Sequence, residues 1–101
     1  MTKIIVLFNL HPDADKHVYE DWARTTDLPV ARKLPSIDKF EVFRTTGLLD
    51  GGEAPYQYIE VLEVNDLEQL GVDASSDAMQ KVAAEFASFA ANPQFILTES
   101  L

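Results

Sequence analysis

The sequence contains no cysteine and few basic residues. Without cysteine, these residues can form no disulfide bond, thiolate metal site or cysteine nucleophile. Lysine and arginine total 8 against 17 aspartate and glutamate residues, which gives a formal net charge of −9. Because nucleic-acid binding normally requires a basic face that displaces counterions, we expect no nucleic-acid partner.

Long hydrophobic runs are also missing. The longest apolar stretch, residues 4–8, is far too short to span a bilayer. No signal-like segment opens the sequence, so we expect a cytoplasmic protein with no membrane partner. With 47% hydrophobic and 25% charged residues, the composition predicts one globular domain over residues 1–101.

The first third of the chain is predicted to form a strand and two helices. Residues 3–9 are an unbroken apolar run, typical of a strand covered on both faces. A helix is predicted over residues 14–25, with Asp13 or Asp15 as its cap. Because Pro29 fits only the first turn of a helix, Asp27 is expected to cap a second short helix that ends near Leu34.

The rest of the chain predicts a hairpin, two further helical segments and a last strand. The hairpin strands are expected over residues 37–46 and 56–64, joined by a glycine-containing loop. Asn65 is expected to cap a short helical turn that stops at Gly71. A longer amphipathic helix is expected to open at Ser75 or Ser76 and close at Asn92-Pro93, before a strand over 94–100.

This order predicts an α+β, ferredoxin-like βαββαβ fold, with a four-stranded antiparallel sheet and helices on one face. The strands carry apolar side chains on both faces, as Ile4 with Ile5 and Tyr58 with Ile59 illustrate. The face without helices therefore needs a cover. A second copy of the sheet is the simplest one, so we expect a homodimer.

The segment 19–36 resembles the dimeric α/β-barrel superfamily. It holds a tyrosine and tryptophan pair, Tyr19 and Trp22, a polar Asp27 before Pro29, and a leucine-proline before the next strand. Within that superfamily the chain most resembles the RedY/HapK-like proteins, and segments 43–49 and 55–61 extend the match over most of its length. The resemblance implies a homodimeric barrel with a ligand cavity between sheet and helices in each protomer.

The functions implied by the resemblance are broad. The superfamily includes cofactor-free monooxygenases, cyclases, haem-degrading enzymes and stress proteins, and the RedY/HapK-like group is associated with the pyrrole branch of prodiginine (prodigiosin-type) biosynthesis. Relatives of the EthD and stress-barrel type commonly have a histidine where this chain has Asp27. Any chemistry of that histidine does not transfer, and because the only histidines are His11 and His17, a haem ligand has no candidate in the second helix.

Asp27 and His11 are the candidate acid/base residues. A carboxylate beside a buried tryptophan can have a raised pKa and transfer protons, although capping alone also explains Asp27. His11 follows the first strand, where ligand-site residues often lie, although most loop histidines are simple surface residues. His17 is expected to face solvent.

Phe8, Trp22, Tyr58 and Glu60 are the candidate ligand-binding residues. Phe8 and Trp22 are interpreted as pocket wall. Tyr58 and Glu60 share one face of their strand, because side chains alternate with period 2. If that face lines the dimer barrel, Glu60 needs a partner such as Arg44 or a tyrosine hydroxyl. The alternative for Glu60 is a purely structural polar contact.

No metal site or cofactor is expected. Two histidines six residues apart without a third ligand do not form a metal motif, and no glycine-rich phosphate loop opens a helix. The leading hypothesis is a small cofactor-free enzyme of secondary metabolism, a dehydratase, isomerase or cyclase, acting on an aromatic or pyrrole-like molecule. The alternatives are a non-catalytic small-molecule-binding accessory protein and a stress-type dimer with no specific ligand.

Overall fold

The unbroken apolar run near the N-terminus forms the strand β1 (Thr2–Leu10), which lies inside the sheet. The computed structural model describes residues 2–101. In it β1 pairs on one side with β3 (Tyr58–Val64) and on the other with β4 (Ala90–Glu99), and β2 (Ile37–Arg44) pairs with β3. The strand order is β2-β3-β1-β4 and every pairing is antiparallel. The predicted four-stranded antiparallel sheet is confirmed.

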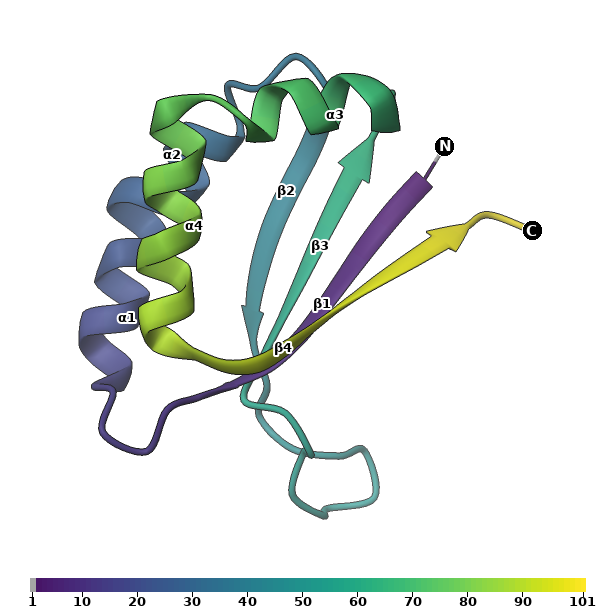
Figure 1. Ribbon diagram of the computed structural model, residues 1–101. Helices are drawn as coiled ribbons and strands as arrows, with labels where there is room; N and C mark the ends of the chain where they lie inside the picture. The colour runs from purple at the N-terminus through teal and green to yellow at the C-terminus, as the bar shows by residue number, and fades with distance from the viewer. Residues whose placement is uncertain (1) are drawn as a thin grey trace.

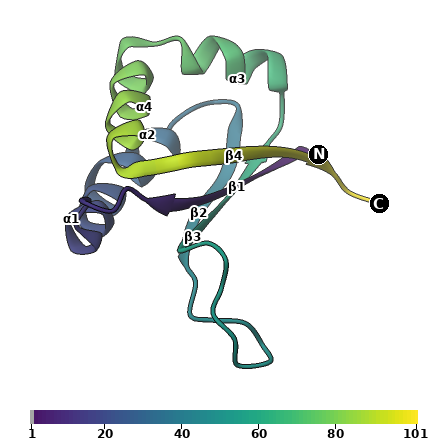
Figure 2. The ribbon, with the colours of Figure 1, turned by 60° about the horizontal axis from the view of Figure 1, so that its bottom comes forward.

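The helices cover one face of this sheet (Figures 1 and 2). The first helical segment is α1 (Lys16–Trp22), which runs into a π-helical turn, η1 (Ala23–Asp27), and then into α2 (Leu28–Ala31). The second contains α3 (Leu67–Ala74) and α4 (Asp77–Phe89). The βαββαβ order and the helices on one face are therefore as predicted, and they give an α+β, ferredoxin-like fold.

For two helices the sequence left two possible caps each, and the structure confirms one of each pair, Asp15 for α1 and Ser76 for α4. The Asp15 carboxylate accepts hydrogen bonds from the backbone N–H groups of His17, at 2.8 Å, and Val18, at 3.1 Å. The Ser76 hydroxyl accepts one from the N–H of Met79. Each side chain satisfies N–H groups that the first turn of a helix leaves without a partner.

The cap of the third helix was predicted wrongly. Asp66, not Asn65, caps α3, because its carboxylate accepts hydrogen bonds from the N–H groups of Glu68 and Gln69. The Asn65 side-chain amide instead donates to the backbone carbonyl of Pro35, which lies just before β2. The helix also continues through Gly71 to Ala74, because a glycine is tolerated inside a helix at a cost of about 1 kcal/mol.

The end of α4 lies three residues earlier than the predicted break. The helix ends at Phe89 and β4 begins at Ala90, so Asn92 and Pro93 lie within the strand. Asn92 has a positive φ of 48°, and the pairing register with β1 shifts at this point. The irregularity belongs to a β-bulge, which accommodates a proline in an edge strand.

The two faces of the sheet differ in their surroundings. The face toward the helices holds the buried core, to which β1 contributes Ile4, Val6 and Phe8. On the opposite face, apolar side chains of all four strands are half-buried or exposed: Ile5, Leu7, Phe43, Ile59, Val61 and Ile96. Within residues 2–101, no helix covers this second face, which is called the open face below (Figure 2).

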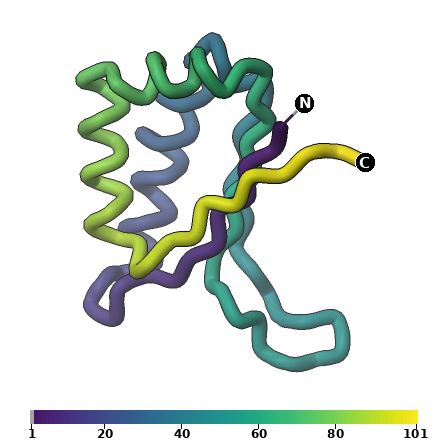
Figure 3. Tube along the Cα trace, turned by 45° about the vertical axis from the view of Figure 1, so that its right-hand side comes forward, coloured from purple at the N-terminus to yellow at the C-terminus, as the bar shows by residue number. Residues whose placement is uncertain are grey.

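An aromatic cluster anchors α1 and α4 to the sheet. Phe8 is stacked on Tyr58, with ring centroids 5.5 Å apart, and meets Tyr19 and Phe86 edge-on. Phe8, Tyr19 and Tyr58 are the largest side chains that are almost fully buried. In Figure 3 the connection between β2 and β3, residues 45–57, projects away from this packed part of the molecule, and the two termini lie near one another at the other end of the sheet.

Replacing Phe8 by alanine should lower the free energy of unfolding by about 3–5 kcal/mol, because large aromatic truncations leave a cavity that the core cannot fill. Urea unfolding followed by circular dichroism measures the change. The matched control is Val72→Ala on the exposed side of α3, which should shift stability by no more than about 0.5 kcal/mol. A loss below about 1 kcal/mol for Phe8→Ala would contradict the packing described here.

Candidate functional site

A cavity of about 230 Å³ lies between the helix-covered face of the sheet and the segments η1, α2, α3 and α4. Its walls are apolar apart from two carboxyl groups, Asp27 and Glu60. No lysine or arginine lines it. The apolar lining includes Ile4, Val6, Phe40, Leu62, Leu70, Met79, Val82, Phe86 and Phe95. We call this space the acidic cavity.

The π-helical turn places Asp27 in this cavity. The backbone N–H of Leu28 donates to the carbonyl of Ala23, five residues back, so the helix widens by one residue before Pro29. The wider turn accommodates the proline ring, which would clash with a carbonyl in a regular helix. Asp27 itself has helical dihedral angles, makes no capping hydrogen bond and is 6% exposed. The interpretation of Asp27 as a helix cap is therefore wrong.

Glu60 lies opposite Asp27 on the sheet side of the cavity. It sits in β3 between Val6 of β1 and Val42 of β2, and its residue is 5% exposed. Its face is the one that the helices cover, so the condition under which Glu60 would line a dimer barrel is not met. Arg44 is not its partner either. Within residues 2–101, the buried Oε2 atom of Glu60 has no hydrogen-bond partner.

Burial raises the pKa of both carboxyl groups. Loss of solvation raises the pKa of Asp27 to about 6. It raises the pKa of Glu60 to about 8, and the nearby charge of Asp27 adds to the effect. At neutral pH the pair therefore holds one proton, mainly on Glu60, while Asp27 is mainly ionised. Two carboxyl groups with separated pKa values are suited to act as one acid and one base.

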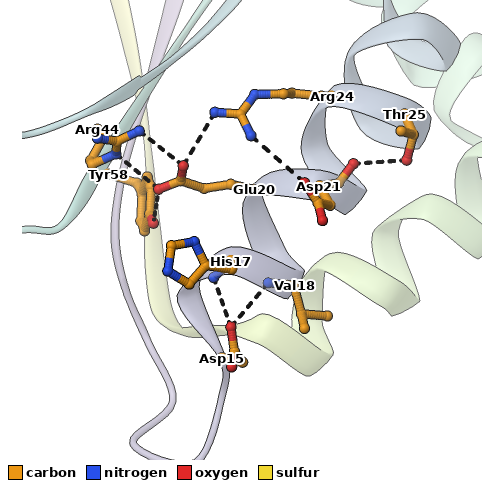
Figure 4. A network of polar contacts seen from close by, with 9 residues as sticks. All are labelled: Asp15, His17, Val18, Glu20, Asp21, Arg24, Thr25, Arg44 and Tyr58. Atoms are coloured by element: carbon orange, nitrogen blue, oxygen red, sulfur yellow. Dashed lines mark hydrogen bonds and ion pairs between the residues drawn. The ribbon is translucent and has the colours of Figure 1, made fainter.

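A third carboxylate, Glu20, has the opposite environment (Figure 4). Arg44 donates to both of its oxygens at 2.9 and 3.0 Å, and the Tyr58 hydroxyl donates at 2.7 Å. Arg24 adds a longer contact of 3.3 Å. Burial of Glu20 would raise its pKa, but the hydrogen bonds from Tyr58 and Arg44 outweigh that effect and lower it. Arg44 is therefore paired with Glu20 and does not form an ion pair with Glu60.

The Glu20 network borders a second, smaller cavity of about 150 Å³. Its lining includes Tyr19, Val42 and Tyr58. Val42 is paired with Glu60 across the sheet, and Tyr58 precedes Glu60 on the same face of β3. The second cavity is therefore adjacent to the acidic cavity along β2 and β3. Tyr58, which the sequence suggested as a ligand-binding residue, therefore lies beside the second cavity and not in the acidic one.

The remaining candidates lie outside both cavities. Phe8 is fully buried in the aromatic core. Trp22 packs against Tyr19 and Phe89, and its buried indole N–H has no partner within residues 2–101. His11 contacts the carbonyl of Ala87 at 3.3 Å through Nε2, in the loop after β1. The structure therefore brings Asp27 and Glu60 together and separates both from His11.

Sequence reasoning missed several parts of the site. The apolar face of the amphipathic helix α4 predicts only packing on the sheet, yet Met79, Val82 and Phe86 of that face also line the acidic cavity. The sequence places Tyr19 on the apolar face of the first helix and in the family motif, but not in a site. Its helical spacing from Trp22 indicates a buried side chain, but no sequence signal reveals which polar groups that side chain meets.

Within the described part of the chain, no three histidine, aspartate or glutamate side chains are grouped closely enough to hold a metal ion. Among the same residues, no helix has the length and apolar character needed to cross a membrane.

Comparison with known proteins identifies the family. The family model described as "REDY-like protein HapK" matches residues 2–101. The chain belongs to this family. No functionally curated protein shows significant sequence similarity to it.

Solved structures agree with this assignment to the REDY-like HapK family. HapK from Hahella chejuensis is 26% identical, with a TM-score of 0.83 and coverage of 100% of this chain and 93% of HapK. A dimeric ferredoxin-like protein of unknown function from Thermobifida fusca is 14% identical, with a TM-score of 0.77 and coverage of 98% and 90%. SnoaB, a cofactor-independent oxygenase from Streptomyces nogalater, is 13% identical, with a TM-score of 0.73 and coverage of 98% and 91%. The last two likenesses show the fold alone.

The buried carboxyl groups of this HapK-family chain predict a stability that falls as pH rises. A folded-state pKa above the unfolded value means that the native state binds more protons than the unfolded state between the two values. The free energy of unfolding should therefore decline between about pH 4 and 8, because burial raises the pKa of Asp27 to about 6 and that of Glu60 to about 8. Hydrogen bonds from Ser36 and Gln69 lower the pKa of Asp73 at the end of α3, and together with the lowered pKa of Glu20 this acts in the other direction, at more acidic pH.

Glu60→Gln should remove most of this decline above pH 6, because glutamine has no proton to lose. Urea unfolding at a series of pH values between 5 and 8 measures the slope. The matched control, Glu53→Gln in the exposed loop, should keep the wild-type slope. An unchanged slope in Glu60→Gln would show that Glu60 is not buried as a protonated acid.

Proposed function

We propose that the protein is a small, cofactor-free enzyme of secondary metabolism that binds an aromatic or pyrrole-like molecule in the acidic cavity and moves protons on it. One observation carries the proposal. Two buried carboxyl groups, Asp27 and Glu60, line the same apolar cavity, and burial raises the pKa of both. Perturbed carboxyl groups in a ligand-sized cavity are the usual mark of acid/base sites.

The two carboxyl groups have complementary roles in this proposal. Ionised Asp27 accepts a proton from a C–H or N–H bond of the substrate, while protonated Glu60 donates its proton to a leaving hydroxyl or to a ring atom. Loss of a hydroxyl in this way releases water, and isomerisation returns the proton to another atom of the same substrate. A proton moving from Asp27 to Glu60 then restores the starting state.

The size and lining of the cavity support a ring-shaped ligand. An apolar cavity of about 150 Å³ can already hold benzene, and the acidic cavity measures about 230 Å³. This volume argues against a stress-type dimer without a specific ligand. The family membership supports a pyrrole-like substrate of prodiginine-type biosynthesis, and the fold is shared with SnoaB, itself described as a cofactor-independent oxygenase.

A non-catalytic accessory protein that binds the same ligand is the second candidate. The separation of His11 from the acidic cavity favours it, because the carboxyl pair is then left without a histidine that could assist proton transfer. His11 takes no part in the proposed chemistry. Phe8 packs behind Phe86 of the cavity wall, Trp22 packs in the core against Tyr19 and Phe89, and Tyr58 lines the second cavity.

We further propose that the protein is a cytoplasmic homodimer whose two open faces pack together. The open face carries apolar side chains from all four strands, and such a surface is costly to leave in water. Structures with this fold include proteins described as dimeric, among them the one from Thermobifida fusca. Dimerisation of this kind leaves the helix-covered face, and with it the acidic cavity, in each protomer.

Asp27→Asn should lower turnover of pyrrole-type intermediates by about 100-fold or more while ligand binding is retained, because the amide keeps the size of the side chain but cannot accept a proton as a carboxylate does. Steady-state kinetics and calorimetric binding measure the two effects. Asp21→Asn, on the exposed side of α1, is the matched control and should keep full turnover. Undiminished turnover in Asp27→Asn would remove Asp27 from the mechanism.

Binding without any turnover in the wild-type protein would support the accessory protein instead. Absence of binding would exclude both candidate functions for the acidic cavity.

Light scattering of the wild-type protein should give twice the mass of the chain at micromolar concentration. Val61→Glu places a charge in the middle of the open face and should yield a folded monomer, because a charge buried in a subunit interface without a partner is strongly unfavourable. Val72→Glu, on the exposed side of α3, should remain dimeric. A wild-type monomer would contradict the proposed dimer without affecting the cavity.

A further inference from the structure

Two neighbouring tyrosines differ in what their hydroxyl groups contact. The rings of Tyr19 and Tyr58 are 4.8 Å apart, and both residues are almost fully buried. The Tyr58 hydroxyl donates to Glu20 at 2.7 Å. The Tyr19 hydroxyl is buried as well, but it has no hydrogen-bond partner within residues 2–101. Because about nine in ten buried polar groups in proteins are hydrogen-bonded, the unpaired hydroxyl requires an explanation.

The position of Tyr19 connects it to the acidic cavity. Its ring packs on Phe8 and Tyr58, which form the next cross-strand pair on the same face of the sheet after Val6 and Glu60. Burial raises the pKa of Tyr19, and among the charges that raise it further the effect of Glu60 is the largest, followed by that of Asp27. Tyr19 also lines the second cavity. The Tyr19 side chain therefore packs against the part of the sheet that adjoins Glu60 on the same face, between the second cavity that it lines and the acidic cavity.

Glu60 contributes the other unpaired atom at this boundary. Its Oε2 is buried without a partner, although the side chain has the capacity to accept or, when protonated, to donate a hydrogen bond. The Tyr19 hydroxyl and Glu60 Oε2 do not bond to each other. A single polar atom that contacts both would satisfy the two groups at once.

The chemistry of the two groups selects the kind of atom. A hydroxyl oxygen can accept a hydrogen bond from Tyr19 and donate its own proton to Glu60, whichever state Glu60 is in. A pyrrole-type N–H can donate but cannot accept from Tyr19, and an aliphatic carbon can do neither. A carbonyl oxygen only accepts and suits both partners only while Glu60 is protonated, whereas a hydroxyl group suits them in either state of Glu60.

We propose that the Tyr19 hydroxyl and Glu60 Oε2 form a two-point binding site for a hydroxyl group on the ligand ring, so that the protein selects hydroxylated aromatic or heteroaromatic molecules. This inference rests on the proposed binding of a ring in the acidic cavity. It makes Tyr19 a residue that determines specificity, and it places the ligand hydroxyl against the carboxyl group that serves as the acid.

Phenol and toluene test the inference because they have nearly the same shape and differ by one hydroxyl group. Calorimetric titration of the dimeric wild-type protein should show phenol binding at least tenfold more tightly than toluene, since a methyl group cannot replace the hydrogen bonds that a hydroxyl makes. Tyr19→Phe should reduce phenol affinity about tenfold, the worth of one such hydrogen bond, and leave toluene affinity unchanged. The matched control, Tyr56→Phe in the loop before β3, should keep the wild-type preference.

Equal affinity of the wild-type protein for phenol and toluene would overturn the inference while the proposed ring-binding function stands. Failure of both compounds to bind would overturn the inference and the proposed ring-binding function together. A wild-type phenol preference that survives in Tyr19→Phe would also overturn the inference. If Tyr19→Phe does not fold, a crystal structure of the wild-type protein with phenol decides, because the phenol oxygen must lie within hydrogen-bond distance of both Tyr19 and Glu60.

Discussion

The burial of two carboxyl groups without a basic partner is the constraint on which the candidate site depends. Ionised carboxylates are costly in an apolar environment, and a protein usually compensates with a paired cation or releases the charge by protonation. Glu60 takes the second route, because within residues 2–101 no lysine or arginine lines the cavity that it shares with Asp27. Burying these carboxyl groups destabilises the folded state, and apolar packing elsewhere in the core, including the aromatic cluster around Phe8, offsets that loss of stability.

The pairing of the nearby arginines with Glu20 leaves the acidic cavity without a basic partner. Arg24, Arg44 and the Tyr58 hydroxyl all donate hydrogen bonds to Glu20, so these groups stabilise the ionised form of Glu20 and not that of Glu60. Two glutamates on opposite sides of one cavity boundary therefore have opposite environments, and their pKa values move in opposite directions. The two residues are of the same type, so their surroundings decide that Glu20 is an ionised, hydrogen-bonded carboxylate and that Glu60 is protonated at neutral pH.

Much of the fold follows from local patterns. The apolar run of β1, the alternation in β3 and the amphipathic stripe of α4 predict their elements because burial of one face dictates their periodicity. Boundaries were less predictable. Pro29 lies in the first turn of α2, as predicted, but Gly71 lies inside α3 and Pro93 lies in a bulged edge strand. Tertiary packing overrides the local preference at Gly71 and Pro93.

The sequence by itself determined the element order, the antiparallel sheet, the apolar character of both sheet faces and the interest of Asp27 and Glu60 as acids. Only the tertiary structure decided that Glu60 faces the helices, that Arg44 pairs with Glu20, and that His11 lies apart from the cavity. The physical reason is that burial patterns depend on local spacing, whereas the partner of a charge depends on which side chains from distant segments reach it first. A one-residue widening of the helix at η1 was enough to turn Asp27 from an expected cap into a cavity group.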